Sequence, residues 1–265
     1  MNSTTTHSKQ RATITLAMMA AALLLLSGCS ASNKPSDEDQ LKRAKLHYQL
    51  GLDALYRDQL PKAFEEFMLA EEIDPDLPEV LDGLGYAWRL RGNLEKSESY
   101  YKRALRAGAG SATHNNYGSL LLQMKKFDQA KVQLKKALED PRYRNQFMAY
   151  INLGDAYLGS DEFDEAIRTY RKAGRFGLNQ TLSRMKEAEA HVAYNQLNYA
   201  QALYEEIFKE QPANRSAIEG LVNVLKLRND RNTARQRLSI FMEQPSISAL
   251  DRAWAADTMI RLNRP

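Results

Sequence analysis

The sequence predicts an all-α protein, a superhelical solenoid of about six helix pairs that ends in a capping helix. Two observations carry this prediction. Ala, Leu, Glu, Lys, Arg and Gln, which favour helices, dominate the 265 residues, whereas Pro and Gly number only 8 and 13. A pattern of small and large residues also recurs six times at steps close to 34 residues. A common step over six copies indicates repeated structural units that stack on one another.

The first 28 residues have the pattern of a secretory signal peptide. Lys9 and Arg11 precede an apolar run from Leu16 to Leu26. This run is too short for a membrane-spanning helix, which needs roughly 20 apolar residues. Removing residues 1–28 deletes both basic residues and no acidic one, so the formal charge falls from +4 to +2.

The end of this segment, Leu26-Ser27-Gly28-Cys29, resembles the bacterial lipobox. The resemblance implies cleavage before Cys29, the only cysteine of the chain, and covalent lipid on its sulfur and its amine. The alternative is an ordinary signal peptide with an incidental cysteine. Residues 29–40 are polar and are expected to form a lipidated flexible tether. By analogy with Gram-negative sorting, the absence of Asp after the cysteine favours the periplasmic face of the outer membrane.

Four columns of the repeat share one register, with steps of 34, 33, 36, 34 and 34 residues. The first column holds small residues in all but its last copy, at Gly51, Gly85, Gly118, Gly154, Ala188 and Val222. The third column holds large residues, at Phe67, Tyr101, Leu134, Tyr170, Tyr204 and Leu238. Ala, or once Ser, lies four residues before each large residue, and the fourth column lies three after it, so these three columns occupy one helix face. The small residues predict a close approach of two antiparallel helices, and the large residue fills the space beside the neighbouring unit.

This pattern resembles the tetratricopeptide repeat, most clearly in the second and fourth copies. The resemblance implies one repeat domain over 41–265. Its expected repeats are 44–77, 78–110, 111–146, 147–180, 181–214 and 215–248, followed by a capping helix over 249–262. The alternative, a generic helical bundle, gives no reason for a common step.

The sequence gives no sign of catalytic or metal chemistry. One cysteine excludes an internal disulfide and a cysteine-rich metal site. The 37 basic and 33 acidic residues are too evenly balanced for a dedicated nucleic-acid binder. Outside the signal peptide, His47, His114 and His191 have no partners at a motif spacing. We therefore expect a binding module rather than an enzyme, with no metal, no small-molecule substrate and no cofactor beyond the lipid on Cys29.

The tetratricopeptide resemblance implies a concave groove lined by first-helix residues that do not pack inside their own repeat. The residues expected there are Tyr48, Leu52, Leu55, Tyr56, Tyr86, Arg89, Asn115, Asn116, Ser119 and Leu122. The N-terminal part of this groove is apolar and aromatic, which suits an amphipathic helix or an extended peptide. The alternative for each residue is packing between repeats. The two adjacent amides either bind a peptide backbone or satisfy an inter-helix turn.

The third repeat, with Asn115-Asn116-Tyr117-Gly118 and the break at Asp140-Pro141, resembles that of the type IV pilus assembly lipoproteins (PilF, PilW and Tgl). This resemblance implies a pilotin, which binds secretin subunits and promotes their localisation and multimerisation at the outer membrane. The alternative is another periplasmic tetratricopeptide lipoprotein scaffold, such as a subunit of the outer-membrane β-barrel assembly machine or a cell-wall hydrolase adaptor.

Overall fold

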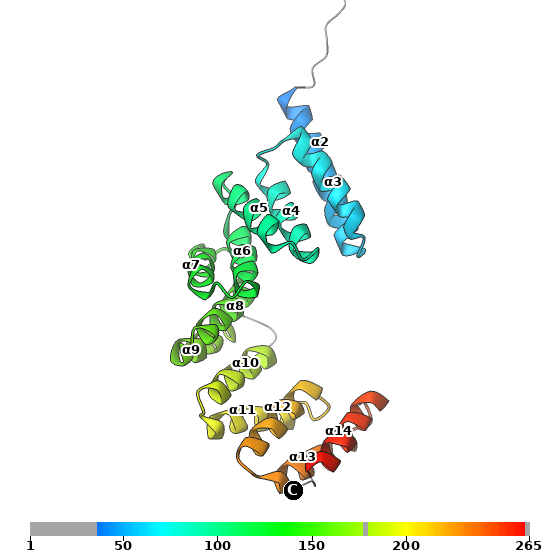
Figure 1. The fold of residues 1–265 in the computed structure, drawn as a ribbon, viewed down its shortest axis with the longest axis vertical. Coiled ribbons are helices and arrows are strands. Elements are labelled where there is room, and N and C mark those ends of the chain that lie inside the picture. The colour runs from blue at the N-terminus through cyan, green and yellow to red at the C-terminus, as the bar shows by residue number, and fades with distance from the viewer. Residues whose placement is uncertain (1–35, 177–179, 263–265) are drawn as a thin grey trace, which may run out of the picture. The chain divides into compact units, whose positions relative to one another are not determined.

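The computed structural model describes residues 36–176 and 180–262, which contain thirteen helices and no strand (Figure 1). Twelve helices form pairs: α2 (Asp37–Tyr56) with α3 (Leu60–Ile73), α4 (Pro78–Leu90) with α5 (Leu94–Arg106), α6 (Ser111–Gln123) with α7 (Phe127–Ala137), α8 (Gln146–Gly159) with α9 (Phe163–Ala173), α10 (Gln180–Ala193) with α11 (Leu197–Glu210), and α12 (Arg215–Leu227) with α13 (Arg231–Met242). The last helix is α14 (Ala249–Leu262). The predicted all-α solenoid of six helix pairs is confirmed.

The chain divides into two units, Met1–Arg43 and Ala44–Pro265. In the first unit, the structure describes the start of α2. The hydroxyl of Ser36 accepts a hydrogen bond of 3.1 Å from the backbone N–H of Asp39, and Lys42 pairs with Glu38 at 2.7 Å. The predicted tether over 29–40 is therefore wrong in its last residues, because a capped helix begins at Asp37. The signal peptide and Cys29 lie outside the described residues.

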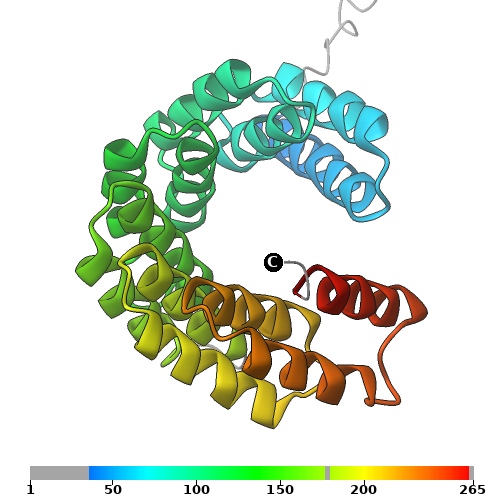
Figure 2. The same ribbon diagram turned by 60° about the horizontal axis from the view of Figure 1, so that its bottom comes forward.

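In the second unit, each second helix packs against its own first helix and against the first helix of the next pair. First helices also contact each other, α4 with α6, α6 with α8, α8 with α10 and α10 with α12. Figure 2 shows the pairs following one another in chain order, with α14 after the last pair. We call the surface formed by the first helices the inner face.

The glycines of the first column lie directly against the large residues of the third. A Cβ atom on Gly118 would be 2.5 Å from Cγ of Leu134, and one on Gly85 would be 2.9 Å from the ring of Tyr101. The same contact joins Gly51 to Phe67 and Gly154 to Tyr170. The large residue also reaches the next pair, because the Phe67 ring is in contact range of Gly83 on α4. These side chains are buried and fill the space between neighbouring units, as the sequence predicts.

The turn inside each pair repeats as regularly as the packing columns. One residue per turn has a positive φ between 56° and 83°, at Asp58, Gly92, Lys125, Asp161, Asn195 and Asn229. The N–H of the following residue donates to the carbonyl five residues earlier, for example from Lys126 to Leu121 at 2.8 Å. This bond belongs to the Schellman motif, which satisfies a free carbonyl at the end of the first helix.

The last helix packs on α13 and covers the C-terminal hydrophobic cluster. Ala255 and Leu262 are buried, and Trp254 lies edge-on to Phe241 with ring centroids 6.2 Å apart. Ala253, next to Trp254, is exposed and takes no part in this packing.

We predict that Gly118→Ala destabilises the chain by about 1–3 kcal/mol, because the new methyl group collides with the buried Leu134. This loss outweighs the gain of up to about 1 kcal/mol that alanine brings inside a helix. Urea unfolding measures the change. Gly110→Ala, at the N-cap of α6, is the control for an added methyl group, since a Cβ there meets no atom within 4 Å. Equal stabilities of the two variants would contradict the packing argument.

Candidate protein-binding surface

The first helix pair exposes apolar side chains on the inner face. Leu52 is 36% exposed and Tyr56 is 90% exposed. Tyr48 and Leu55 are half-buried and pack against the hydrophobic cluster around Phe67. Leu52, Leu55 and Tyr56 lie within one turn of α2, so they present a continuous apolar strip. This strip is available to a partner.

The predicted groove residues of the second and third pairs contact one another instead. The guanidinium of Arg89 lies over the Tyr86 ring at 5.1 Å, and its Nη1 donates to the hydroxyl of Ser119 at 2.8 Å. The amide of Asn116 donates to the carboxylate of Asp82 at 3.1 Å. These residues are half-buried, and Tyr86 and Leu122 pack against one hydrophobic cluster. In this part of the inner face, the predicted groove residues therefore pack between repeats, which was the alternative to binding a partner.

Asn115 does not present its amide to a partner, and its assignment to the groove is corrected. It is only 6% exposed, and its Oδ1 accepts a hydrogen bond of 3.0 Å from Asn152 on α8. Adjacent residues on a helix point about 100° apart, so Asn115 and Asn116 cannot face the same side. Asn116 faces α4, and Asn115 faces α8. The two amides join three repeats.

Asp82 places a half-buried carboxylate in this region of the inner face. Burial raises the pKa of the Asp82 carboxyl above its ordinary value, and hydrogen bonds from Thr113 and Asn116 only partly oppose the rise. Burial, together with the charge of Asp82, also raises the pKa values of Tyr48 and Tyr143. Tyr143 belongs to the segment between α7 and α8.

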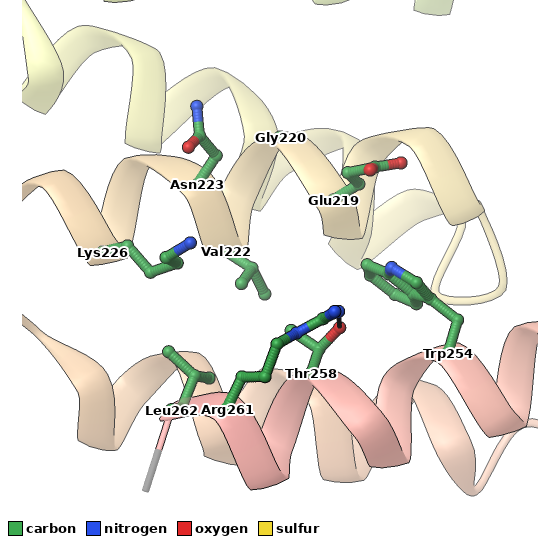
Figure 3. Close-up of a pocket in the computed structure, with 9 residues that line it drawn as sticks. All are labelled: Glu219, Gly220, Val222, Asn223, Lys226, Trp254, Thr258, Arg261 and Leu262. Atoms are coloured by element: carbon green, nitrogen blue, oxygen red, sulfur yellow. Dashed lines mark hydrogen bonds between the residues drawn. The ribbon is translucent and has the colours of Figure 1, made fainter. Parts of the chain in front are cut away.

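A cavity of about 450 Å³ lies between α12 and α14 (Figure 3). Its walls consist of Glu219, Gly220, Val222, Asn223, Lys226, Trp254, Thr258, Arg261 and Leu262. The sequence predicts both helices but not the space between them. The available signal was Val222, a larger residue where most other repeats carry glycine, which marks the last pair as irregular.

Within residues 36–176 and 180–262, no three His, Cys, Asp or Glu side chains come together as possible metal ligands. Of the described helices, none combines the length and apolar character needed to cross a membrane.

The comparisons with known proteins identify the repeat. The family description "Tetratricopeptide repeat" matches residues 111–139 and 149–173, which lie in the third and fourth pairs. The structure of PilW, a type IV pilus biogenesis factor, superimposes with a TM-score of 0.70 at 15% identity, over 80% of this chain and 98% of that one. Tetratricopeptide repeats are therefore present in this chain, and its fold is that of a tetratricopeptide-repeat solenoid.

The relationship to PilF covers most of the chain. The type IV pilus assembly protein PilF of Pseudomonas aeruginosa is 26% identical over 233 residues, which are 84% of this chain and 90% of PilF. A PilF structure superimposes with a TM-score of 0.65 at 22% identity, over 83% of this chain and 99% of that one. A Haemophilus influenzae protein of uncharacterised function is 25% identical over 149 residues, 56% of this chain and 79% of that protein. The chain is homologous to PilF.

We predict that Asp82→Asn gains stability relative to wild type as the pH rises from about 4 to about 7. The folded-state pKa of Asp82 is raised, so ionisation is less favourable in the folded chain than in the unfolded chain. The wild type therefore loses stability as the pH rises through that pKa, whereas the amide does not titrate. Urea unfolding of both proteins at the two pH values measures this difference. Asp76→Asn, at an exposed position, is the surface control. If the stability of the wild type rose relative to that of Asp82→Asn as the pH increases, the predicted direction of the effect would be wrong.

Proposed function

We propose that this protein is an outer-membrane lipoprotein of type IV pilus biogenesis, a pilotin that binds secretin subunits and promotes their localisation and multimerisation. The observation that carries the proposal is the homology to PilF, which spans 84% of this chain and 90% of the relative. A match over nearly the full length of both proteins covers the arrangement of repeats as well as the repeat itself. This homology supports a role in type IV pilus biogenesis.

The apolar strip of the first pair is the proposed secretin-binding surface. Leu52 and Tyr56 are exposed on α2, and the half-buried Tyr48 and Leu55 extend the same surface into the core. Exposed apolar side chains on a rigid helix match the apolar face of an amphipathic helix or the alternate side chains of an extended peptide. The protein then acts by binding, and catalysis has no part in the mechanism.

Lipid on Cys29 would anchor the protein at the outer membrane. Each buried CH₂ contributes about 0.8 kcal/mol to membrane binding, so two or more acyl chains hold the protein stably at the membrane. Tethered copies raise the local concentration of bound secretin subunits, which favours their assembly into a multimer. The residues before Asp37 connect this anchor to the first helix.

We predict that Leu52→Glu with Tyr56→Glu lowers the affinity for secretin subunits at least about tenfold, because two charges replace exposed apolar contacts. Leu55 is left unchanged, since it packs against the hydrophobic core. Pull-down of the secretin measures binding, and far-UV circular dichroism checks the helices.

Met68→Glu with Leu69→Glu is the matched control, because these side chains are also exposed but lie on the second helix α3. Unchanged secretin capture by the Leu52 and Tyr56 variant, or equal loss in the control, would refute the surface. A deletion strain tests the function itself: secretin should remain monomeric while porin levels stay normal. Lowered porins with intact secretin rings would favour a scaffold of the β-barrel assembly machine.

We predict that Cys29→Ala abolishes lipid attachment and outer-membrane localisation, because no other cysteine can form the thioether. Membrane fractionation and the mobility of the unprocessed precursor measure the effect. Cleavage and outer-membrane fractionation like the wild type would refute the lipoprotein assignment.

A further inference from the structure

The cavity between α12 and α14 is built from two facing helix surfaces. On α12, Glu219, Asn223 and Lys226 follow one another at helical spacing. On α14, Trp254, Thr258 and Arg261 do the same. Near the starts of the two helices, Arg215 of α12 contacts Trp254 and Asp251 of α14, and further along the helices leave a space between them. The inner face is therefore interrupted by a cavity at this point.

One side of the cavity is apolar. Val222 and Leu262 are buried at 3% and 5% exposure, and the half-buried Trp254 adds its ring. The ring is held in place from two directions. The Phe241 ring lies perpendicular to it with the ring centroids 6.2 Å apart, and the guanidinium of Arg215 lies 3.2 Å from the Trp254 centroid. An apolar side chain that enters the cavity would therefore contact a Trp254 ring whose orientation is fixed by its neighbours.

Two cations line the same cavity. Figure 3 shows the guanidinium of Arg261 directed between the two helices and the ammonium of Lys226 close to α12, beside Val222. Arg261 pairs with Asp257 at 2.9 Å and donates to the hydroxyl of Thr258 at 3.2 Å. Lys226 is exposed and makes no side-chain hydrogen bond or ion pair in the described part of the chain.

The acidic residues nearby do not pair with Lys226. Glu219 stands at the Trp254 end of the cavity and pairs with Arg215 at 2.8 Å. Asp257 is already paired with Arg261. Lys226 therefore lies beside the apolar wall as an exposed cation with no ion-pair partner among the described residues. A carboxylate carried next to an apolar side chain complements both features.

A purely structural explanation makes a different prediction. Lys226 and Arg261 both lie in the last turns of their helices, where cations stabilise the free carbonyls. If that were their only role, replacing them would lower stability slightly and would not affect any ligand. The two explanations are therefore separable by a binding measurement.

We propose that this cavity is a second peptide-binding site, which takes an acidic side chain adjacent to an aromatic or aliphatic one in a segment of a partner protein. Its volume of about 450 Å³ is in the range of pockets that hold such groups. Its place between first helices puts it on the inner face, where an extended segment can lie along the repeats. The proposal does not depend on the identity of the client of the first pair.

The experiment uses the full chain with Trp88→Phe, which leaves Trp254 as the single tryptophan and as a reporter inside the cavity. The probes are two blocked peptides, Ac-GSFESG-amide and Ac-GSFQSG-amide, which differ only in the carboxylate. The glutamate peptide should change the Trp254 fluorescence saturably and bind about tenfold more tightly than the glutamine peptide.

Lys226→Met with Arg261→Met should remove this preference, whereas Lys136→Met, at an exposed lysine on the helix end of α7, should keep it. Lys226→Gln alone is the second variant, because Lys226 is exposed and unpaired and its loss should leave the fold intact. Equal binding of the two peptides, or no saturable change at millimolar peptide, would overturn the proposal. A preference for glutamate that survives the double substitution would do the same.

Discussion

In the first four repeats, a pair of helices closes around a large side chain that presses on a glycine of the opposite helix. Because glycine has no Cβ, the ring of Tyr101 or the branched end of Leu134 lies where a methyl group would collide with it. The contact sets how closely the two helices approach. Phe67 also reaches Gly83 of the next pair, and Tyr204 of α11 lies against Gly220 of α12. The same side chain therefore holds the pair together and positions its neighbour, so the inner face depends on it.

That packing leaves different amounts of free surface along the stack. In the second and third pairs, the inner-face residues bind one another, through Arg89 to Ser119 and Asn116 to Asp82. In the first pair, Leu52 and Tyr56 have no such partners and are exposed. At the other end, α12 and α14 enclose a cavity beside Lys226, which has no ion-pair partner among the described residues. Side chains without inter-repeat partners occur towards the two ends, where the proposed binding sites lie.

The turns show how a repeat tolerates sequence variation. Each pair needs one residue with positive φ, yet only the second pair uses Gly92. Asp, Asn or Lys occupies the equivalent position in the other pairs, although positive φ costs a residue with a Cβ about 1–2 kcal/mol. The hydrogen bond that closes the first helix and the packing of both helices hold the turn in that conformation. Local preference agrees with the backbone at five of the six turns, which carry Gly, Asp or Asn, and only Lys125 depends on the surrounding packing alone.

By itself the sequence determined the repeat, its register and the fold, because helix contacts within a pair follow the sizes of residues at short, regular spacing. Gly118 and Leu134 are recognisable as a contact from their place in the columns. The first turn of α2 was also encoded locally, in Ser36 and the acids after it, but the polar composition of residues 29–40 concealed it. Only the tertiary structure decided that Asn115 is buried against Asn152, that Asp82 is half-buried, and that α12 and α14 enclose a cavity. These features depend on how helices from different repeats are rotated and spaced, and many side chains together set that geometry.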